Sequence, residues 1–99
     1  MKLGCTLLVR DEIDMIKPWL EHHLPLVDEM VITDNNSIDG TRELLQKYKS
    51  KKLMIIDEPE KTYLQDQWVD RMIRILKDKK CTHVFNSDCD EMWHCDFKR

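Results

Sequence analysis

Short apolar runs alternate with longer amphipathic stretches along the chain, and this order restricts the fold more than any other feature. The first apolar run, Leu3–Val9, contains Leu7, Leu8 and Val9 in succession, which is typical of a strand buried on both faces. The clearest helical pattern runs from residue 63 or 64 to 79, where apolar residues recur at helical spacing. The expected order is strand 3–9, helix 13–24, strand 29–33, a helix after residue 40, strand 53–56, helix 63/64–79 and strand 82–87.

Strands that alternate with helices in this way indicate right-handed crossovers and a mainly parallel sheet with helices on its faces. The chain has 99 residues, 41% hydrophobic and 35% charged, which fits one compact domain rather than a disordered segment. At this length a second lobe of comparable size would lack a core of its own. We therefore predict a single Rossmann-like α/β domain over residues 1–99.

Charge and hydropathy exclude several functional classes. The formal net charge is −3 and no single-sign block is large enough to suggest a nucleic-acid platform. No stretch is long and apolar enough to predict a transmembrane segment, and the amino terminus lacks the pattern of a signal peptide. We expect a cytoplasmic protein in which the four cysteines are free thiols.

Local signals add expectations about the helices. Pro18 is predicted in the first turn of the main part of the first helix, where its missing N–H costs nothing. Ser37 or Asp39 is predicted to cap the second helix. Trp19 and Trp68 lie on apolar stripes, so we expect both in the core. Of the adjacent histidines at 22 and 23, we expect one packed against the sheet and one exposed.

A dense acidic segment, Asp88-Cys89-Asp90-Glu91, directly follows the last expected strand. Side chains two residues apart on an extended chain project to the same side, so Asp88 and Asp90 face one point. Two converging carboxylates repel each other unless a cation, a shared proton or a donor lies between them. Mn²⁺ or Mg²⁺ suits oxygen ligands and is often held by one or two carboxylates plus substrate phosphates. The alternative is an acidic turn whose carboxylates cap a helix or face water.

The other expected strands also end in acidic residues: Asp11-Glu12, Asp34 and Asp57-Glu58. Open α/β sheets bind ligands at the carboxyl ends of their strands, so these acids favour a ligand site at that edge. The first strand is not followed by either of the familiar glycine-rich phosphate loops, so a metal ion would have to hold the phosphates.

Four ordered segments then resemble a known family. They are V-R-D-E at 9–12, W-L-E-H-H at 19–23, T-D-N-N-S-I-D-G-T at 33–41 and D-C-D-E-M-W at 88–93. Together they resemble the amino-terminal, nucleotide-sugar-binding half of family-two-like glycosyltransferases with the GT-A fold. The sequence departs from the family pattern at Asp11, Ile38 and Met92, where Asn, Thr and Phe are usual.

The resemblance implies a nucleotide pocket. Asp34 would contact the nucleotide base, and the main chain around Val9 and Arg10 would line the same pocket. Arg71 is the nearest match to a basic residue that approaches the nucleotide in such enzymes. A uridine diphosphate sugar is the favoured ligand.

The resemblance also implies a metal-dependent transfer reaction. Asp88 would meet the ribose or the metal, and Asp90 would ligate the Mn²⁺ or Mg²⁺ ion that bridges the two phosphates. The sugar would pass to a glycan or another hydroxyl acceptor, with inversion at the anomeric carbon expected by analogy. The acceptor-binding half and its general base are expected to be missing, and Glu91 is the nearest candidate base.

Two other classes stay open. A zinc site would draw on Cys81, His83, Cys89, His94 and Cys95, although there is no C-x-x-C pair and a strand would separate Cys81 from Cys89. A non-catalytic α/β module would bind a nucleotide or a partner protein without sugar transfer.

Overall fold

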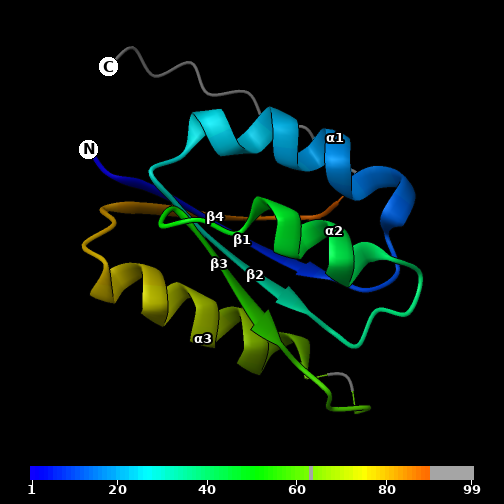
Figure 1. The fold of residues 1–99 in the computed structure, drawn as a ribbon. Coiled ribbons are helices and arrows are strands. Elements are labelled where there is room, and N and C mark those ends of the chain that lie inside the picture. The colour runs from blue at the N-terminus through cyan, green and yellow to red at the C-terminus, as the bar shows by residue number, and fades with distance from the viewer. Residues whose placement is uncertain (63, 90–99) are drawn as a thin grey trace.

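The computed structural model describes residues 1–62 and 64–89, and it has the predicted α/β architecture (Figure 1). Four parallel strands alternate with helices, which confirms the predicted fold class. The elements are β1 (Leu3–Val9), α1 (Ile13–His23), the short 3-10 helix η1 (Leu24–Leu26), β2 (Glu29–Asp34), α2 (Thr41–Tyr48), β3 (Leu53–Asp57), α3 (Gln65–Asp78) and β4 (His83–Ser87).

The strand order is β3-β2-β1-β4. β2 and then β3 are added on one side of β1, whereas β4, which follows α3, pairs with β1 on its other side. In register, Val9 of β1 lies opposite Asp34 of β2, which lies opposite Asp57 of β3. The carboxyl ends of these strands therefore form one edge, and the direction of winding reverses between β1 and β4.

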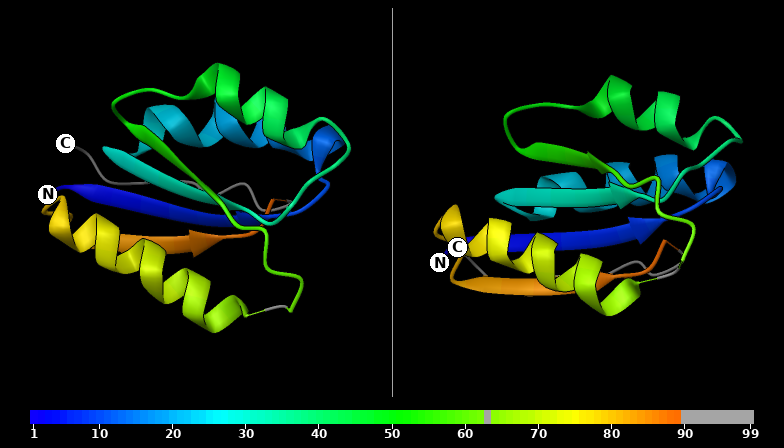
Figure 2. Two further views of the ribbon diagram at one scale, coloured as in Figure 1. Left: turned by 60° about the horizontal axis from the view of Figure 1, so that its bottom comes forward. Right: turned by 90° about the horizontal axis from the view of Figure 1, so that it is seen from below.

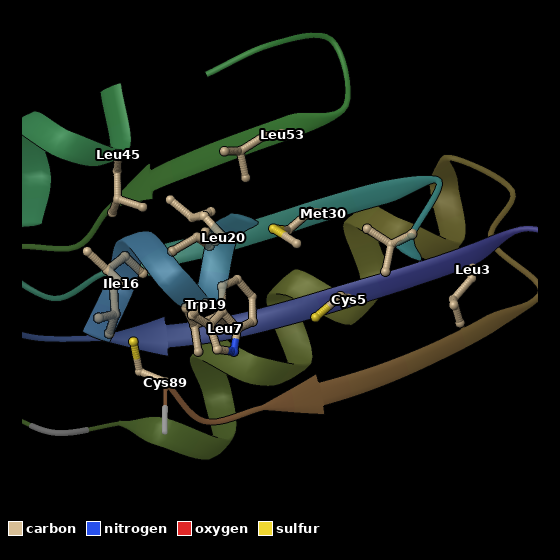
Figure 3. Packing of buried hydrophobic residues seen from close by; sticks show 13 residues of the cluster. Leu3, Cys5, Leu7, Ile16, Trp19, Leu20, Met30, Leu45, Leu53 and Cys89 are labelled. Carbon is tan, nitrogen blue, oxygen red and sulfur yellow. The ribbon is translucent and has the colours of Figure 1, made fainter. Parts of the chain in front are cut away.

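Helices cover both faces of the sheet. α1 and α2 lie on one face and α3 lies on the other, as both views in Figure 2 show. The larger core forms under α1 and α2, where Trp19 and Leu20 pack against Leu7 and Met30 (Figure 3). The smaller core forms under α3 and contains Val31, Met72 and Leu76.

The central strand β1 is buried on both faces, as its apolar run predicts. Cys5 and Leu7 belong to the core under α1, while Leu8 packs against the core under α3. Thr6 is fully buried as well, and its hydroxyl donates a 2.7 Å hydrogen bond to Asn86 Oδ1 on β4. A buried hydroxyl with such a partner avoids the cost of an unsatisfied polar group.

The end of α3 lies very close to β1 at Gly4. A Cβ atom at this position would lie 3.0 Å from both Cys81 Sγ and Leu76 Cδ1. The absence of a side chain at Gly4 is therefore what allows α3 to approach the sheet so closely.

The prediction for Pro18 was wrong. α1 is continuous from Ile13, so Pro18 is its sixth residue and lies beyond the first turn. The helix begins this early because its amino terminus is held by the β2–α2 loop and by the first residue of α2: Ile13 N donates to Asp39 Oδ2 and Glu12 N donates to Thr41 Oγ1. Pro18 is exposed on the outer surface of α1, and its missing N–H removes one hydrogen bond inside the helix.

The predictions for the aromatic and histidine side chains are confirmed in large part. Trp19 and Trp68 are buried. His23 is fully buried and stacks on Trp19 with ring centroids 4.3 Å apart, whereas His22 is half-buried.

Cys5, Cys81 and Cys89 are free thiols, as expected, and burial raises the pKa of the Cys5 thiol. Within residues 1–62 and 64–89, no helix has the length and apolar character needed to cross a membrane.

Candidate ligand site at the carboxyl edge of the sheet

A pocket of about 350 Å³ lies where β1 and β4 end. Leu8, Arg10 and Glu12 line it from the end of β1 and the turn that follows, and Asp88 and Cys89 line it from the end of β4. β1 and β4 are the neighbours between which the winding of the sheet reverses. Open α/β sheets bind ligands in the crevice that opens at this point.

The turn after β1 presents Arg10 and Glu12 on either side of Asp11, which has a left-handed backbone with φ of 53°. Asp is among the residues that tolerate this conformation best. Asp11 N donates to Ser37 Oγ at 2.9 Å, and Asp11 Oδ1 accepts from Ile38 N at 2.7 Å. The conformation that aims Arg10 and Glu12 is therefore held by the β2–α2 loop.

Asp39 links the amino termini of α1 and α2. Its Oδ1 accepts from both N and Oγ1 of Thr41, at 3.0 and 2.6 Å, and its Oδ2 accepts from Ile13 N at 3.1 Å. The hydrogen bond from the Thr41 hydroxyl is the main reason why the pKa of Asp39 is lower than usual. The prediction that Ser37 or Asp39 occupies the amino-cap position of α2 was wrong, because Gly40 occupies it. Asp39 instead binds Thr41, the first residue of α2, whereas Ser37 donates to Asp34.

Asp34 is fully buried at the end of β2, and both its carboxylate oxygens have partners. Ser37 Oγ donates to Oδ1 at 2.5 Å, and Arg42 Nε donates to Oδ2 at 3.1 Å. Another guanidinium nitrogen of Arg42 forms an ion pair with Asp57. The hydrogen bond with Asp34, followed by the charge of Asp57, raises the pKa of Arg42 above its ordinary value. The contact between Asp34 and a nucleotide base stays a prediction.

The remaining predicted nucleotide residues lie in different places. Val9 is buried, and its carbonyl accepts a 2.9 Å hydrogen bond from Asn35 N. Arg71 on α3 pairs with Glu58, just after β3, at 2.8 Å. The structure thus brings Arg10 and Asp88 together in the pocket, places Val9 at the end of β1 beside it, and puts Arg71 near the end of β3.

The beginning of the acidic segment is anchored to the core. Ser87 Oγ accepts a 3.1 Å hydrogen bond from Trp19 Nε1 and donates one to the Asp88 carbonyl. Cys89 is 7% exposed and packs in the core under α1 (Figure 3). Asp88 is exposed and lines the pocket. The predicted metal ligand Asp90 and the candidate base Glu91 lie outside the described residues.

The pocket has the donor chemistry of a hard divalent cation, because Glu12 and Asp88 both supply carboxylate oxygens. Within the described part of the chain, no group of three or more His, Cys, Asp or Glu side chains could hold a metal ion. A complete ligand set would therefore need Asp90, substrate phosphates or water in addition to Asp88.

The positions of the described candidate zinc ligands give little support to a zinc site. Cys81 precedes β4 and Cys89 follows it, so the length of this strand separates the two thiols, as the sequence suggested. His94 and Cys95 lie outside the described residues.

Two residues of the site were not assigned an individual role from the sequence. Glu12 lines the pocket, and it was considered only as one of the acidic residues at the strand ends and as part of the D-E pair after β1. Arg42 neutralises the buried Asp34, and its position directly after the D-G-T sequence was the only local hint.

Comparison with models of known protein families and with curated proteins finds no match for this chain. The resemblance to glycosyltransferases therefore stays an expectation.

Proposed function

We propose that this domain binds a nucleoside diphosphate sugar, with a uridine diphosphate sugar favoured, at the carboxyl edge of its sheet. In this proposal a divalent cation assists binding, and the sugar is transferred to an acceptor hydroxyl group. The observation that carries the proposal is the position of the pocket: it opens between β1 and β4, where the winding reverses, and both Arg10 and Asp88 line it.

The charges around the pocket support a phosphate ligand with a metal ion. Arg10 supplies a guanidinium, which suits phosphate oxygens, and Glu12 and Asp88 supply carboxylates, which suit Mn²⁺ or Mg²⁺. A ligand that carries both a diphosphate and a divalent cation complements this mixed lining better than either an anion or a cation alone.

Asp88 and, from the sequence, Asp90 would hold the ion, with phosphate oxygens and water as the other ligands. When bound, Mn²⁺ or Mg²⁺ acts as a Lewis acid that stabilises negative charge on the departing nucleoside diphosphate. Arg10 would help to bind the phosphates, and the hydrogen bonds of Asp11 with the β2–α2 loop would keep Arg10 and Glu12 in place.

Titration calorimetry with uridine diphosphate, with and without Mn²⁺, tests the proposal. We expect metal-dependent binding that falls at least about tenfold in Arg10→Met, Asp88→Asn and Asp90→Ala, because each loses a charge-assisted contact. Asp78→Asn is the matched control for Asp88→Asn, since Asp78 is an exposed aspartate at the opposite edge of the sheet.

The proposal fails if uridine diphosphate does not bind. It also fails if the affinity is the same with and without Mn²⁺ and is unchanged in all three pocket variants. An assay for sugar transfer from the uridine diphosphate sugar then separates an enzyme from a binding module. Metal-dependent binding without transfer to any hydroxyl acceptor would favour the non-catalytic module.

A further inference from the structure

Lysines gather at the amino edge of the sheet, opposite the pocket. They come from the start of β1, from the end of α2 and the loop to β3, and from the end of α3 and the loop to β4, which lie together on one side of Figure 1. These amino-edge lysines make up eight of the 16 basic residues: Lys2, Lys47, Lys49, Lys51, Lys52, Lys77, Lys79 and Lys80.

Within residues 1–62 and 64–89, four acidic residues share this edge: Glu21, Asp28, Glu29 and Asp78. Counted over these residues, the edge has an excess of four positive charges. By contrast, the carboxyl edge has an excess of five negative charges across the described residues. It holds nine acidic residues (Asp11, Glu12, Asp34, Asp39, Asp57, Glu58, Glu60, Asp66 and Asp88) against four basic ones (Arg10, Arg42, Lys61 and Arg71). A chain with a net charge of −3 thus has a basic pole and an acidic pole.

Most of the amino-edge lysines are available to a partner. Lys2 and Lys79 approach Glu29 at 3.7 and 3.8 Å. The other six form no ion pair within residues 1–62 and 64–89, and all of these except the half-buried Lys52 are exposed.

The chemistry of this edge fits a lipid surface. All eight cations are ammonium groups, which attract phosphate as point charges and lack the planar fork of arginine. Met1, with 57% of its surface exposed, places an apolar side chain beside Lys2. Exposed lysines around an apolar tip are the combination that binds the headgroup region of an anionic bilayer.

Nucleic acid fits this edge less well. Proteins that bind single strands stack bases on exposed aromatic side chains. Among the described residues, Tyr48 lies between Lys47 and Lys49 in the sequence, and it is half-buried and packs against the core under α1.

We propose that the amino-edge lysines dock this domain on an anionic lipid bilayer. The acidic pole is repelled by the same surface, so the domain docks with the amino edge down and the pocket facing water. This orientation follows from the separation of charges and holds whether or not the pocket binds a nucleotide.

Co-sedimentation with phosphatidylcholine vesicles, with and without phosphatidylserine, tests the proposal. We expect binding only to the vesicles that contain phosphatidylserine, strongest at low ionic strength and weaker at physiological salt because screening shortens the reach of the lysines. The variant Lys49→Gln/Lys51→Gln/Lys80→Gln should partition about 100-fold less, since each lysine near such a surface contributes about fivefold.

The control Lys17→Gln/Lys61→Gln/Arg74→Gln removes the same charge from α1, the β3–α3 loop and the middle of α3. It should bind nearly as well as the unaltered protein, and circular dichroism melts should show that both triple variants fold. Failure to bind phosphatidylserine vesicles at low salt would overturn the proposal. Equal binding to neutral vesicles, an equal loss in the control, or tight binding to RNA with none to vesicles would do the same.

Discussion

Arg42 Nε lies 3.1 Å from Oδ2 of Asp34, and the carboxylate that it neutralises is fully buried. A buried charge without a partner is costly, so this contact decides whether β2 can end in an aspartate. Because Arg42 also pairs with Asp57, a single side chain from α2 ties together the ends of β2 and β3.

Arg42→Met should lower the midpoint of urea unfolding, because it leaves the Asp34 carboxylate buried and short of a positive partner. Arg42→Lys should recover part of the loss, since one ammonium group replaces a guanidinium that serves two carboxylates. Arg74→Met is the control, because Arg74 pairs with Asp70 on an exposed face of α3 and exposed ion pairs contribute little to the free energy of unfolding. A midpoint for Arg42→Met no lower than that of the control would contradict the importance of the Asp34 contact.

Asp39 should make the free energy of unfolding depend on pH in the acidic range. Its pKa is lower in the folded protein than in the unfolded chain, so its contribution to the free energy of unfolding is complete above about pH 4. That contribution is lost as the pH falls from there through the folded pKa. Urea unfolding at a series of acidic pH values should therefore show a shallower pH dependence for Asp39→Asn. Asp14→Asn is the control on α1, and the same slope for Asp39→Asn and the unaltered protein would count against the contacts of Asp39 with Thr41 and Ile13.

Ser87→Ala should destabilise the protein by about 1–3 kcal/mol, because it leaves the buried Trp19 N–H without its acceptor. In the Trp19→Phe background the same substitution should cost less, since the donor is already gone. A double-mutant cycle by chemical denaturation measures this coupling. Independent effects of the two substitutions would show that the hydrogen bond contributes nothing.

Gly4→Val should destabilise the protein by about 1–3 kcal/mol by overpacking the contact between β1 and the end of α3. Leu76→Ala removes two of the three side-chain atoms that a Cβ at residue 4 would meet and leaves Cys81 Sγ, so the cost of Gly4→Val should shrink in that background without disappearing. Thermal melts of the four proteins in this cycle provide the measurement. A gain in stability for Gly4→Val alone would mean that the neighbouring side chains can move aside.

Much of the fold could be predicted from local pattern. The continuous apolar run of β1 indicated burial on both faces, and the helical spacing around Trp68 and Met72 indicated α3. The placement of Pro18 failed because the start of α1 depends on Asp39 and Thr41, which are distant in the sequence.

The site was predictable to a smaller extent. The position of Asp88 after a buried strand, together with the family resemblance at Arg10, indicated two residues that do line one pocket. Arg42 was missed because nothing in an amphipathic helix shows that one of its cations reaches back to a buried aspartate. The contact of Asp34 with a nucleotide base stays a prediction. In this structure the two carboxylate oxygens of Asp34 are bound by Ser37 and Arg42.

The order of residues along this chain was enough to specify alternating strands and helices and acidic strand ends, because both depend on neighbours within a few positions. The side of β1 on which β4 pairs is different, since it depends on where α3 packs over the sheet. That packing, which Gly4 allows, is a contact between residues more than 70 positions apart. It brings Asp88 beside Arg10, and so creates the pocket that separate segments of sequence could not define.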